Sequence, residues 1–382
     1  MQEMLLCSGK VPLPEGNIKR FDTTSRGIVA LSDSGRLYSI GDQMVSGTGG
    51  TVTTWTLVIT DVEDFSAGYN SLLIRMLDGR WMFMGLNYMF PTSIGSTVTT
   101  PTDVSEFMQY PEGLTVRSFS ISGRSVGVVF TDGQYAMCGL NGSGGLGQGN
   151  TTAVRGLAMR SDFTTVKKLV FDPVVDTSYL LLENGRAYVA GDSSYGQAGS
   201  ISASIPTWTL QQLVCVDIFV GFSGWFMVTQ PGGTRYAVYV QGRQFDGSLG
   251  TGNSSNSNVT NPTAVWQNIN DITKGSPVIY TGLYSARVTH PVTGVLYFTG
   301  TNSGNSQGTG PNQQPRYSFT AMSGDVLQGE YHGLKNMYQA TYLLIDGNLY
   351  GTGKDTTVAG ILPGVPTTGS DVYVPLDTSL IV

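Results

Sequence analysis

Charged side chains are scarce in this sequence. Only 13% of the 382 residues are charged, the formal net charge is −6 and the pI is near 4.9. Proteins that bind nucleic acid generally present clustered Lys and Arg side chains to the phosphate backbone. The composition therefore argues against a nucleic-acid partner. It also argues against intrinsic disorder, because 40% of the residues are hydrophobic and can build a large core.

Histidine, the commonest general acid or base near neutral pH, is almost absent. The two histidines are His290 and His332, and neither has a nucleophile at the spacing of a catalytic motif. The glycine-rich segment Asn141–Asn150 is not followed by Lys-Ser or Lys-Thr, so it does not predict a phosphate-binding loop. We expect no catalytic residues, no cofactor and no enzymatic activity.

Clusters of metal ligands are also missing from the sequence. No CxxC, HExxH or calcium-loop pattern occurs. The tightest acidic group, Asp61, Glu63 and Asp64, is predicted to be a solvated strand edge rather than a metal site. The cysteines are too few and too widely spaced for a disulfide framework, and we expect buried free thiols at Cys7, Cys138 and Cys215.

Long hydrophobic runs are absent as well. No apolar segment is long enough to cross a bilayer. The first ten residues, MQEMLLCSGK, lack the basic region and the long apolar stretch of a secretory signal. We therefore expect no membrane insertion and no secretory leader.

Glycine is abundant, with 51 residues, and it recurs in a fixed hairpin unit. The unit is an apolar strand, a glycine turn, a second strand with an aromatic residue, and a closing glycine. It occurs seven times, with hairpin cores near residues 28–42, 71–87, 126–141, 178–192, 225–242, 286–302 and 341–355. The structural turn glycines are Gly35, Gly79, Gly133, Gly185, Gly233, Gly294 and Gly347, and the closing glycines are Gly41, Gly85, Gly139, Gly191, Gly242, Gly300 and Gly353.

The chemistry of the turns explains this pattern. Pairs such as Asp78-Gly79 and Asn184-Gly185 supply the positive φ angles that a short hairpin turn needs. The closing glycine predicts a point where the chain passes close to another backbone or turns sharply. The strands on either side of each turn are apolar on both faces, as expected for sheets buried between neighbouring sheets.

Further strands raise the count to about four for each repeat. A pair of short strands precedes most hairpins, for example in Thr54–Gly68 and Thr207–Gly221. Seven such repeats predict an all-β fold, a seven-bladed β-propeller of four-stranded blades that forms a single domain over residues 1–382. An open solenoid is the alternative. The similar end segments Ser8–Pro14 and Val372–Asp377 predict that the ring is closed by pairing of the N- and C-terminal strands.

The repeat resembles that of the RCC1 (regulator of chromosome condensation) family. The best match is LLLENGRAYVAGDSSYGQAG, Leu180–Gly199, and the next is VVFTDGQYAMCGLNGSGGLGQG, Val128–Gly149. The resemblance runs from about Ile18 onward and implies the propeller fold. Its implications for function are broad, because such propellers include exchange factors, light sensors and enzyme inhibitors. The basic tail and the Gly-Trp-Arg-His-Thr motifs of two such members are missing here.

Tryptophans recur at one position of the repeat. Trp55, Trp208 and Trp266 occupy the same strand of their repeats, so we expect them to pack in the core or between blades. The polar loops after the closing glycines are the candidate binding surface, and they are longest at Arg243–Thr263 and Thr301–Ser318. We expect them to gather on one face of the ring and to offer four candidate binding residues, Tyr195, Arg243, Phe245 and Arg316.

Together these features predict a non-enzymatic protein-interaction propeller. The low charge and the Gly, Ser, Thr and Asn content favour a structural or attachment component of a virus particle, such as a phage tail, located in the virion. Its partners would be other proteins of a larger assembly, or a cell-surface glycan or receptor. The alternative is a cytoplasmic regulatory binding module, similar to an exchange factor or an inhibitor.

Overall fold

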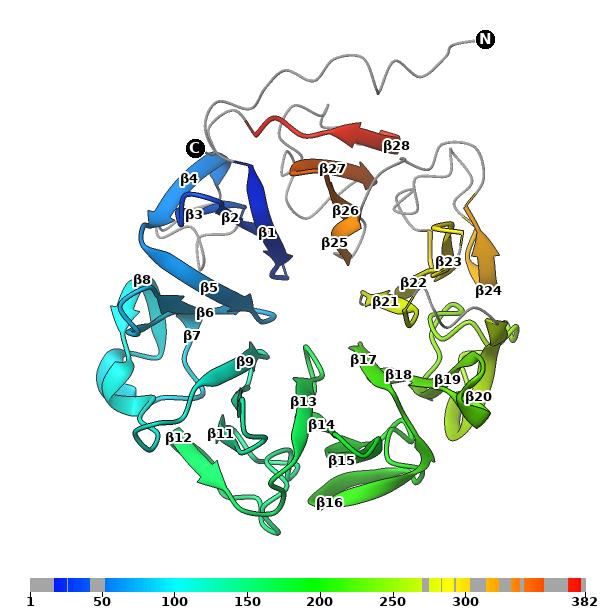
Figure 1. Cartoon of the computed structure of the whole chain (residues 1–382), viewed down its shortest axis with the longest axis horizontal. Coiled ribbons are helices and arrows are strands. Elements are labelled where there is room, and N and C mark those ends of the chain that lie inside the picture. The colour runs from blue at the N-terminus through cyan, green and yellow to red at the C-terminus, as the bar shows by residue number, and fades with distance from the viewer. Residues whose placement is uncertain are drawn as a thin grey trace.

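The chain folds as an all-β propeller with four-stranded antiparallel blades. The computed structural model describes residues 17–25, 27–41, 52–269, 275–282, 284–291, 293–302, 314–322, 331–336, 340–353 and 370–378. Within these residues, 28 strands form seven four-stranded sheets arranged around a central axis (Figure 1). In chain order, the blades are β1–β4 (Ile18–Thr23, Gly27–Ser32, Leu37–Gly41, Val52–Ile59), β5–β8 (Val62–Ala67, Ser71–Met76, Trp81–Leu86, Thr97–Asp103), β9–β12 (Val116–Ile121, Ser125–Phe130, Tyr135–Gly139, Val154–Arg160), β13–β16 (Val166–Phe171, Thr177–Leu182, Arg186–Ser193, Ser202–Val214), β17–β20 (Asp217–Gly221, Gly224–Thr229, Tyr236–Arg243, Asn258–Ile269), β21–β24 (Val278–Thr281, Ser285–Thr289, Leu296–Gly300, Arg316–Ala321) and β25–β28 (Tyr331–Asn336, Ala340–Ile345, Asn348–Gly353, Ser370–Pro375).

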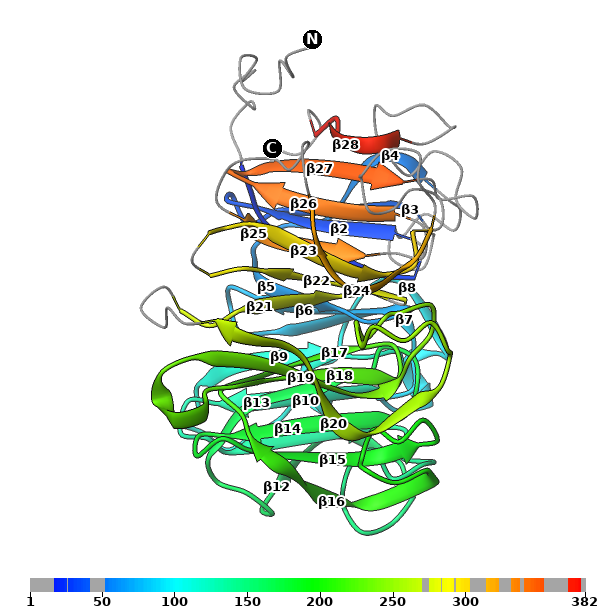
Figure 2. The ribbon, with the colours of Figure 1, turned by 90° about the vertical axis from the view of Figure 1, so that its right-hand side faces the viewer.

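Each blade is a meander whose strands follow one another from the central axis outward (Figure 1). The strands run from one face of the ring to the other (Figure 2). Because neighbouring strands are antiparallel, the first-to-second and third-to-fourth connections of every blade emerge on the same face. We call this the loop face, and we call the face with the second-to-third turns the turn face. None of the described helices, which are three 3₁₀ turns, is long and apolar enough to cross a membrane.

The predicted hairpin cores are the second and third strands of the blades. The two short strands predicted upstream of most hairpins belong to two different blades. In Thr54–Gly68, β4 is the outermost strand of the first blade, whereas β5 is the innermost strand of the second. Asp61, at φ 61°, lies in the tight turn between them. Four strands for each repeat is therefore confirmed, but the pair is divided between two blades.

The turn glycines lie where the second strand of each blade turns into the third. All seven, from Gly35 to Gly347, have φ between 69° and 87°. The preceding Asp or Asn closes several of these turns: Asp78 Oδ1 accepts the N–H of Arg80 at 3.0 Å, and Asn184 Oδ1 accepts the N–H of Arg186 at 3.0 Å. These short side chains accept a local backbone hydrogen bond that fixes the turn.

The closing glycines lie against the backbone of the loop face, as their position predicts. A Cβ atom on Gly191 would lie under 3.0 Å from the carbonyl oxygen of Asp176, a residue in the turn between the first two strands of the blade. The next residue, Asp192, donates its N–H to that same oxygen at 2.9 Å. The contact recurs at Gly85, Gly139, Gly242 and Gly300. The prediction of a close backbone approach is confirmed at these five positions.

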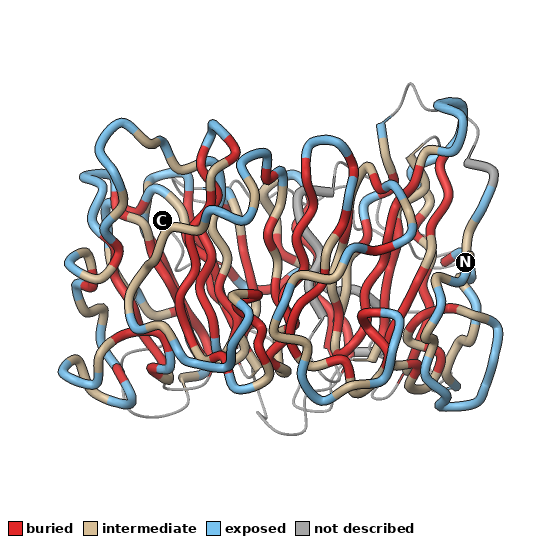
Figure 3. Tube along the Cα trace, turned by 90° about the horizontal axis from the view of Figure 1, so that it is seen from below, coloured by how far each residue is buried: buried red, intermediate tan, exposed pale blue. Residues whose placement is uncertain are grey.

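The apolar core fills the spaces between neighbouring blades. One cluster joins Val29 and Leu31 of the first blade to Phe65, Leu72 and Met84 of the second. The buried strands and the exposed connections on both faces are visible in Figure 3. The core is therefore divided into interblade layers, which explains why the hairpin strands are apolar on both sides.

The junction of the first and last blades differs from the predicted shared blade. All four described strands of each blade are consecutive, and β28 pairs with β27 alone. Ser8–Pro14, one of the two segments expected to pair, lies outside the described residues. The two blades instead meet through side chains: Ile28 packs in one cluster with Ala340 and Tyr342. Trp55 Nε1 also donates to the carbonyl oxygen of Asp377 at 3.0 Å.

Replacing Trp55 with Phe should therefore weaken this junction. The substitution removes the indole N–H and leaves the Asp377 carbonyl without that donor, at an expected cost of about 1 kcal/mol in the free energy of unfolding. Urea denaturation measures the loss. The matched control is Trp208→Phe, because Trp208 Nε1 has no hydrogen-bond partner among the described residues. Equal losses in the two variants would show that the Trp55 hydrogen bond does not stabilise the junction.

Candidate functional site

An arginine surrounded by aromatic rings lies on the loop face where the fourth, fifth and sixth blades meet. The guanidinium carbon of Arg243 lies over the ring of Tyr195 at 4.7 Å, and over the rings of Phe222 and Phe245 at 5.2 Å each. Tyr284 adds a fourth ring, 4.7 Å from Phe245 and 5.5 Å from Phe222 between centroids. We call these five residues the Arg243 cluster. All five are half-buried.

The cluster comes from loop-face connections of three blades. Tyr195 follows β15, Phe222 lies between β17 and β18, Arg243 ends β19, Phe245 follows it, and Tyr284 lies between β21 and β22. Aromatic rings attract a cation placed over their faces, and the attraction grows when water is displaced. The rings therefore hold the guanidinium at a fixed place on the surface.

The guanidinium of Arg243 has no polar partner among the residues that the structure describes. Among the described residues, all ion pairs are formed by other side chains, and the side chain of Arg243 donates no hydrogen bond. A guanidinium carries five N–H donors and normally engages several of them. Arg243 thus combines a restrained position with N–H donors that no described residue accepts, which is the arrangement expected of a binding residue.

Three of the four predicted binding residues meet in this cluster, and the fourth does not. Tyr195, Arg243 and Phe245 contact one another as described. Arg316 begins β24 on the same face, where its carbonyl oxygen accepts a hydrogen bond from Thr299 Oγ1 at 2.9 Å. The side chain of Arg316 is not among the groups that contact Arg243. Its described role is a backbone contact within the sixth blade.

Sequence reasoning missed Phe222 and Tyr284. Both lie in the short turn that enters a hairpin, in GFSGW and GLYSA, rather than in a long polar loop. Alignment of the hairpin entries contained a usable signal, because an aromatic residue stands there in the fifth and sixth repeats. The topology then brings these turns beside the third-to-fourth loops.

The long loops are seated on the next blade rather than free in solvent. Within Asn141–Asn150, a Cβ atom on Gly147 would overlap the indole of Trp208 in the next blade, and Gly149 donates its N–H to Pro206 at 2.7 Å. Gly252 makes the same kind of bond to the carbonyl oxygen of Tyr317 at 2.7 Å. Asn141–Asn150 is thus a connection within the third blade that packs against the fourth.

Two buried glutamines hold the Tyr195 loop in place. Gln241 Nε2 donates to the carbonyl oxygen of Gly196 at 3.1 Å, and Gln197 Oε1 accepts the N–H of Tyr195 at 3.0 Å. Both side chains are fully buried. These bonds fix one wall of the Arg243 cluster before any partner arrives.

A buried carboxylate holds the turn that carries Phe222, on the other side of the Arg243 cluster. Asp172 Oδ2 accepts the N–H of Ser223 at 2.6 Å, and Oδ1 accepts the N–H groups of Val174 and Val175 at 3.0 Å each. Burial raises the pKa of Asp172 to about 7, although these three donors favour the charged form. Ser223, at φ 56°, immediately follows Phe222, so Asp172 ties that turn to the fourth blade.

This carboxylate gives stability a defined pH dependence. The folded pKa of Asp172, about 7, exceeds its unfolded value of 3.8, so the folded chain holds a proton that the unfolded chain has lost. Between these values, the Asp172 contribution to the free energy of unfolding should fall by about 1.4 kcal/mol per pH unit. The titratable groups that face the Asp172 carboxyl are Asp192 and Tyr179.

The measurement is the difference in urea-denaturation free energy between the wild type and Asp172→Asn across pH 4 to 8. The wild type should lose stability relative to the variant from about pH 4 to about pH 7, and the difference should then become constant. A difference that is independent of pH over this range would contradict the raised pKa.

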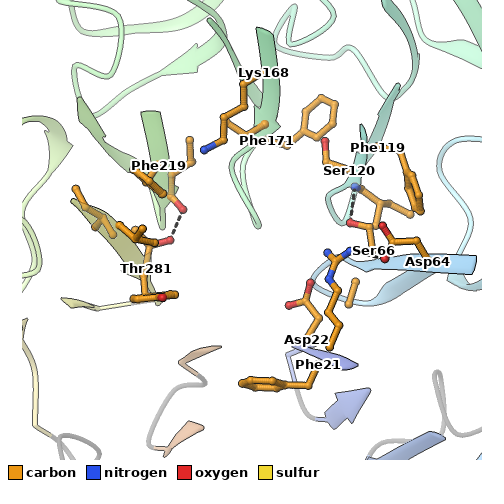
Figure 4. A pocket seen from close by; sticks show the side chains of 18 of the residues that line it. Phe21, Asp22, Asp64, Ser66, Phe119, Ser120, Lys168, Phe171, Phe219 and Thr281 are labelled. Carbon is orange, nitrogen blue, oxygen red and sulfur yellow. Dashed lines mark hydrogen bonds and ion pairs between the residues drawn. The ribbon is translucent and has the colours of Figure 1, made fainter. Parts of the chain in front are cut away.

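Charged side chains contribute to the lining of the central cavity, and Arg20, Asp64 and Lys168 among them form ion pairs between neighbouring blades. The innermost strands enclose a cavity of about 910 Å³ (Figure 4). Arg20 Nη1 lies 2.5 Å from Asp64 Oδ1 across the first two blades, and Lys168 Nζ lies 2.8 Å from Asp217 Oδ1 across the fourth and fifth. Glu63 likewise pairs with Arg75, at 2.8 Å. The acidic group predicted to be a solvated strand edge thus supplies two ion pairs.

The remaining reactive residues have structural surroundings. His290 Nδ1 accepts the N–H of Thr293 at 3.3 Å, and its ring packs against Trp266. The side chain of His332, like Cys7, lies outside the described residues. Cys138 and Cys215 are free and buried, and burial raises the pKa of each thiol to about 12. In the described ranges, no three His, Cys, Asp or Glu side chains are grouped as a metal site would require.

The three aligned tryptophans pack between blades, as predicted. Trp55 reaches the last blade through Asp377, and Trp208 lies against Gly147 of the third. Trp266 in β20 stacks on Phe319 of the sixth blade, with 6.1 Å between ring centroids and an interplanar angle of 19°. They form no common cluster among these contacts.

Comparison with known proteins supports the fold. No protein-family model and no curated protein sequence matches the chain. Among solved structures, yeast RCC1 (Prp20), from a crystal structure with Kap60, matches with a TM-score of 0.72 and 15% identity over 97% of this chain and 86% of that chain. Human WBSCR16 matches with a TM-score of 0.68 and 16% identity over 86% and 85%. Identities at this level establish an RCC1-like propeller fold and nothing more specific.

A further structure of Prp20p from Saccharomyces cerevisiae, described with its binding properties to Gsp1p and histones, matches with a TM-score of 0.66 and 13% identity. The match covers 82% of this chain and 79% of that chain. These binding properties belong to the yeast protein.

Proposed function

We propose that this chain is a non-enzymatic protein-binding propeller that engages its partner through the Arg243 cluster. The observation that carries the proposal is a half-buried arginine, held by three aromatic rings, with no polar partner in the described part of the chain. Arginine and aromatic residues in a desolvated, well-packed setting are the residue types that dominate protein-binding energy. The fixed walls around the cluster lower the entropy that binding must overcome.

Of the two expected settings, we favour a regulatory binding module over a component of a virus particle. Proteins of similar fold include yeast RCC1 (Prp20), whose solved structures involve Kap60 and concern binding to Gsp1p and histones. This likeness supports a protein partner. It lends no support to a phage tail, a receptor or a cell-surface glycan, although the composition first favoured a virion.

A pull-down from the native source tests the proposal. The bait is the full chain, compared with the double variant Arg243→Ala, Phe245→Ala. The matched control is Leu77→Ala, Arg80→Ala, which removes one apolar and one arginine side chain from an exposed turn on the turn face. The wild type and the control should retain the same specific protein, and the double variant should lose it. Retention by the double variant would refute the proposal.

A further inference from the structure

We infer that Arg243 is a receptor for a single carboxylate, the side chain of an Asp or Glu residue on a protein partner. This inference rests on the proposed function, since it names the chemistry that the partner presents to the Arg243 cluster. The guanidinium supplies the hydrogen-bond donors. The rings of Tyr195, Phe222 and Phe245 hold it in place and pack against the methylene groups of the incoming side chain.

The unused donors define the ligand as an acceptor. A guanidinium presents a planar fork that matches the two oxygens of a carboxylate, and the paired bonds are charge-assisted. Aromatic rings attract the positive charge but cannot accept all five N–H bonds. In the described part of the chain no carboxylate lies within ion-pair distance of Arg243, so a carboxylate that pairs with it would come from outside those residues.

The number of charges selects a carboxylate over a phosphoryl group. The cluster contains one cation and four aromatic rings, and the whole chain carries a formal net charge of −6. Phosphoryl recognition generally uses clusters of arginines, because the group carries close to two negative charges. A single guanidinium neutralises a single carboxylate. A nucleic-acid backbone is generally bound by a series of cations, whereas the Arg243 cluster offers one.

The cluster is also prepared for this ligand before binding. The backbone N–H of Arg243 donates to the carbonyl oxygen of Ser223 at 2.8 Å, and Ser223 is held in turn by Asp172. Phe245 donates its N–H to Ser248 Oγ at 3.2 Å. These bonds hold the backbone of Arg243, of Phe245 and of the turn that carries Phe222. Little rearrangement therefore accompanies carboxylate binding.

Selection of peptides gives a test that does not require the native partner. A displayed library of random linear peptides is selected on the immobilised full chain, and the strongest peptide is measured by fluorescence polarisation. We expect an Asp or Glu to be enriched at one position. Arg243→Gln should weaken binding by about tenfold or more, and Arg243→Lys, which keeps the charge without the planar fork, should weaken it less.

A double-mutant cycle identifies the pair. Replacing the selected peptide Glu by Gln should weaken binding to the wild type by a factor close to that of Arg243→Gln, and it should have almost no effect on the Arg243→Gln variant. Arg80→Gln on the turn face is the control and should leave affinity unchanged. Thermal melting of each variant establishes that the fold is retained.

Three outcomes would overturn the inference: selected peptides without an acidic residue, a peptide Glu whose effect is the same with and without Arg243, or stronger binding when phosphoserine replaces that Glu. Each leaves the proposed function intact if the pull-down partner still depends on Arg243 and Phe245. The proposed function fails separately, when the native partner is retained by that double variant.

Discussion

Replacing Gly191 with Ala is expected to lower the free energy of unfolding by about 4 kcal/mol. Gly191 has φ 110°, a conformation in which residues with a side chain are strained, at a cost of about 1–3 kcal/mol. The new Cβ would also lie under 3.0 Å from the carbonyl oxygen of Asp176, a backbone atom that cannot rotate away. Relief requires a backbone shift, which costs about 1–3 kcal/mol more.

The shift would also break a hydrogen bond of the loop face, since the same oxygen accepts the N–H of Asp192. The control is Gly79→Ala, where φ is also positive, at 87°, but nothing lies within 4 Å of the added Cβ. We expect the control to lose about 1 kcal/mol. Urea denaturation of both variants measures the difference, and equal losses would mean that the φ angle alone requires glycine at position 191.

The hairpins of the propeller could be predicted because each is a local structure. Asn184-Gly185, for example, specifies a turn, the apolar residues on both sides specify buried strands, and Gly191 specifies a close approach. Each of these signals acts within a single blade. Recurrence along the chain then indicates a repeat architecture, and the observed meander of four strands follows from it.

The junction of the two ends could not be predicted in the same way. The similarity of Ser8–Pro14 and Val372–Asp377 suggested strand pairing, whereas β28 pairs only within its own blade. The structure instead describes contacts made by side chains, including the hydrogen bond from Trp55 to the carbonyl oxygen of Asp377. Trp55 and Asp377 are 322 residues apart, and no local sequence pattern predicts such a pair.

The site was predicted only in part for a related reason. Arg243, Phe245 and Tyr195 could be identified because a large arginine or aromatic side chain is unusual in loops made mostly of Gly, Ser, Thr and Asn. Phe222 and Tyr284 do not, since an aromatic residue at a strand end is ordinary in a β protein. Their place in the cluster depends on which turns share a face, and that depends on the strand order of whole blades.

Replacing Trp225 with Ala is expected to destabilise the chain by about 4 kcal/mol and to disrupt the Arg243 cluster as well. Trp225 in β18 is fully buried, lies 5.1 Å from the ring of Tyr179, and donates its indole N–H to the carbonyl oxygen of Gln197 at 3.1 Å. Loss of a buried Trp side chain typically costs about 3–5 kcal/mol. The cavity would open where the fourth and fifth blades meet.

The link to function runs through Gln197, because its side chain also accepts the N–H of Tyr195. If Gln197 moves, Tyr195 loses this hydrogen bond and its fixed position in the Arg243 cluster. Binding of the selected peptide should therefore weaken along with stability. Trp225→Phe is the control: it keeps an aromatic ring, loses only the indole hydrogen bond and some volume, and should cost about 1–2 kcal/mol with binding retained. Peptide affinity is measured at a temperature where both variants are folded. Unchanged affinity in the folded Trp225→Ala variant would mean that the rings around Arg243 keep their positions without support from the blade junction.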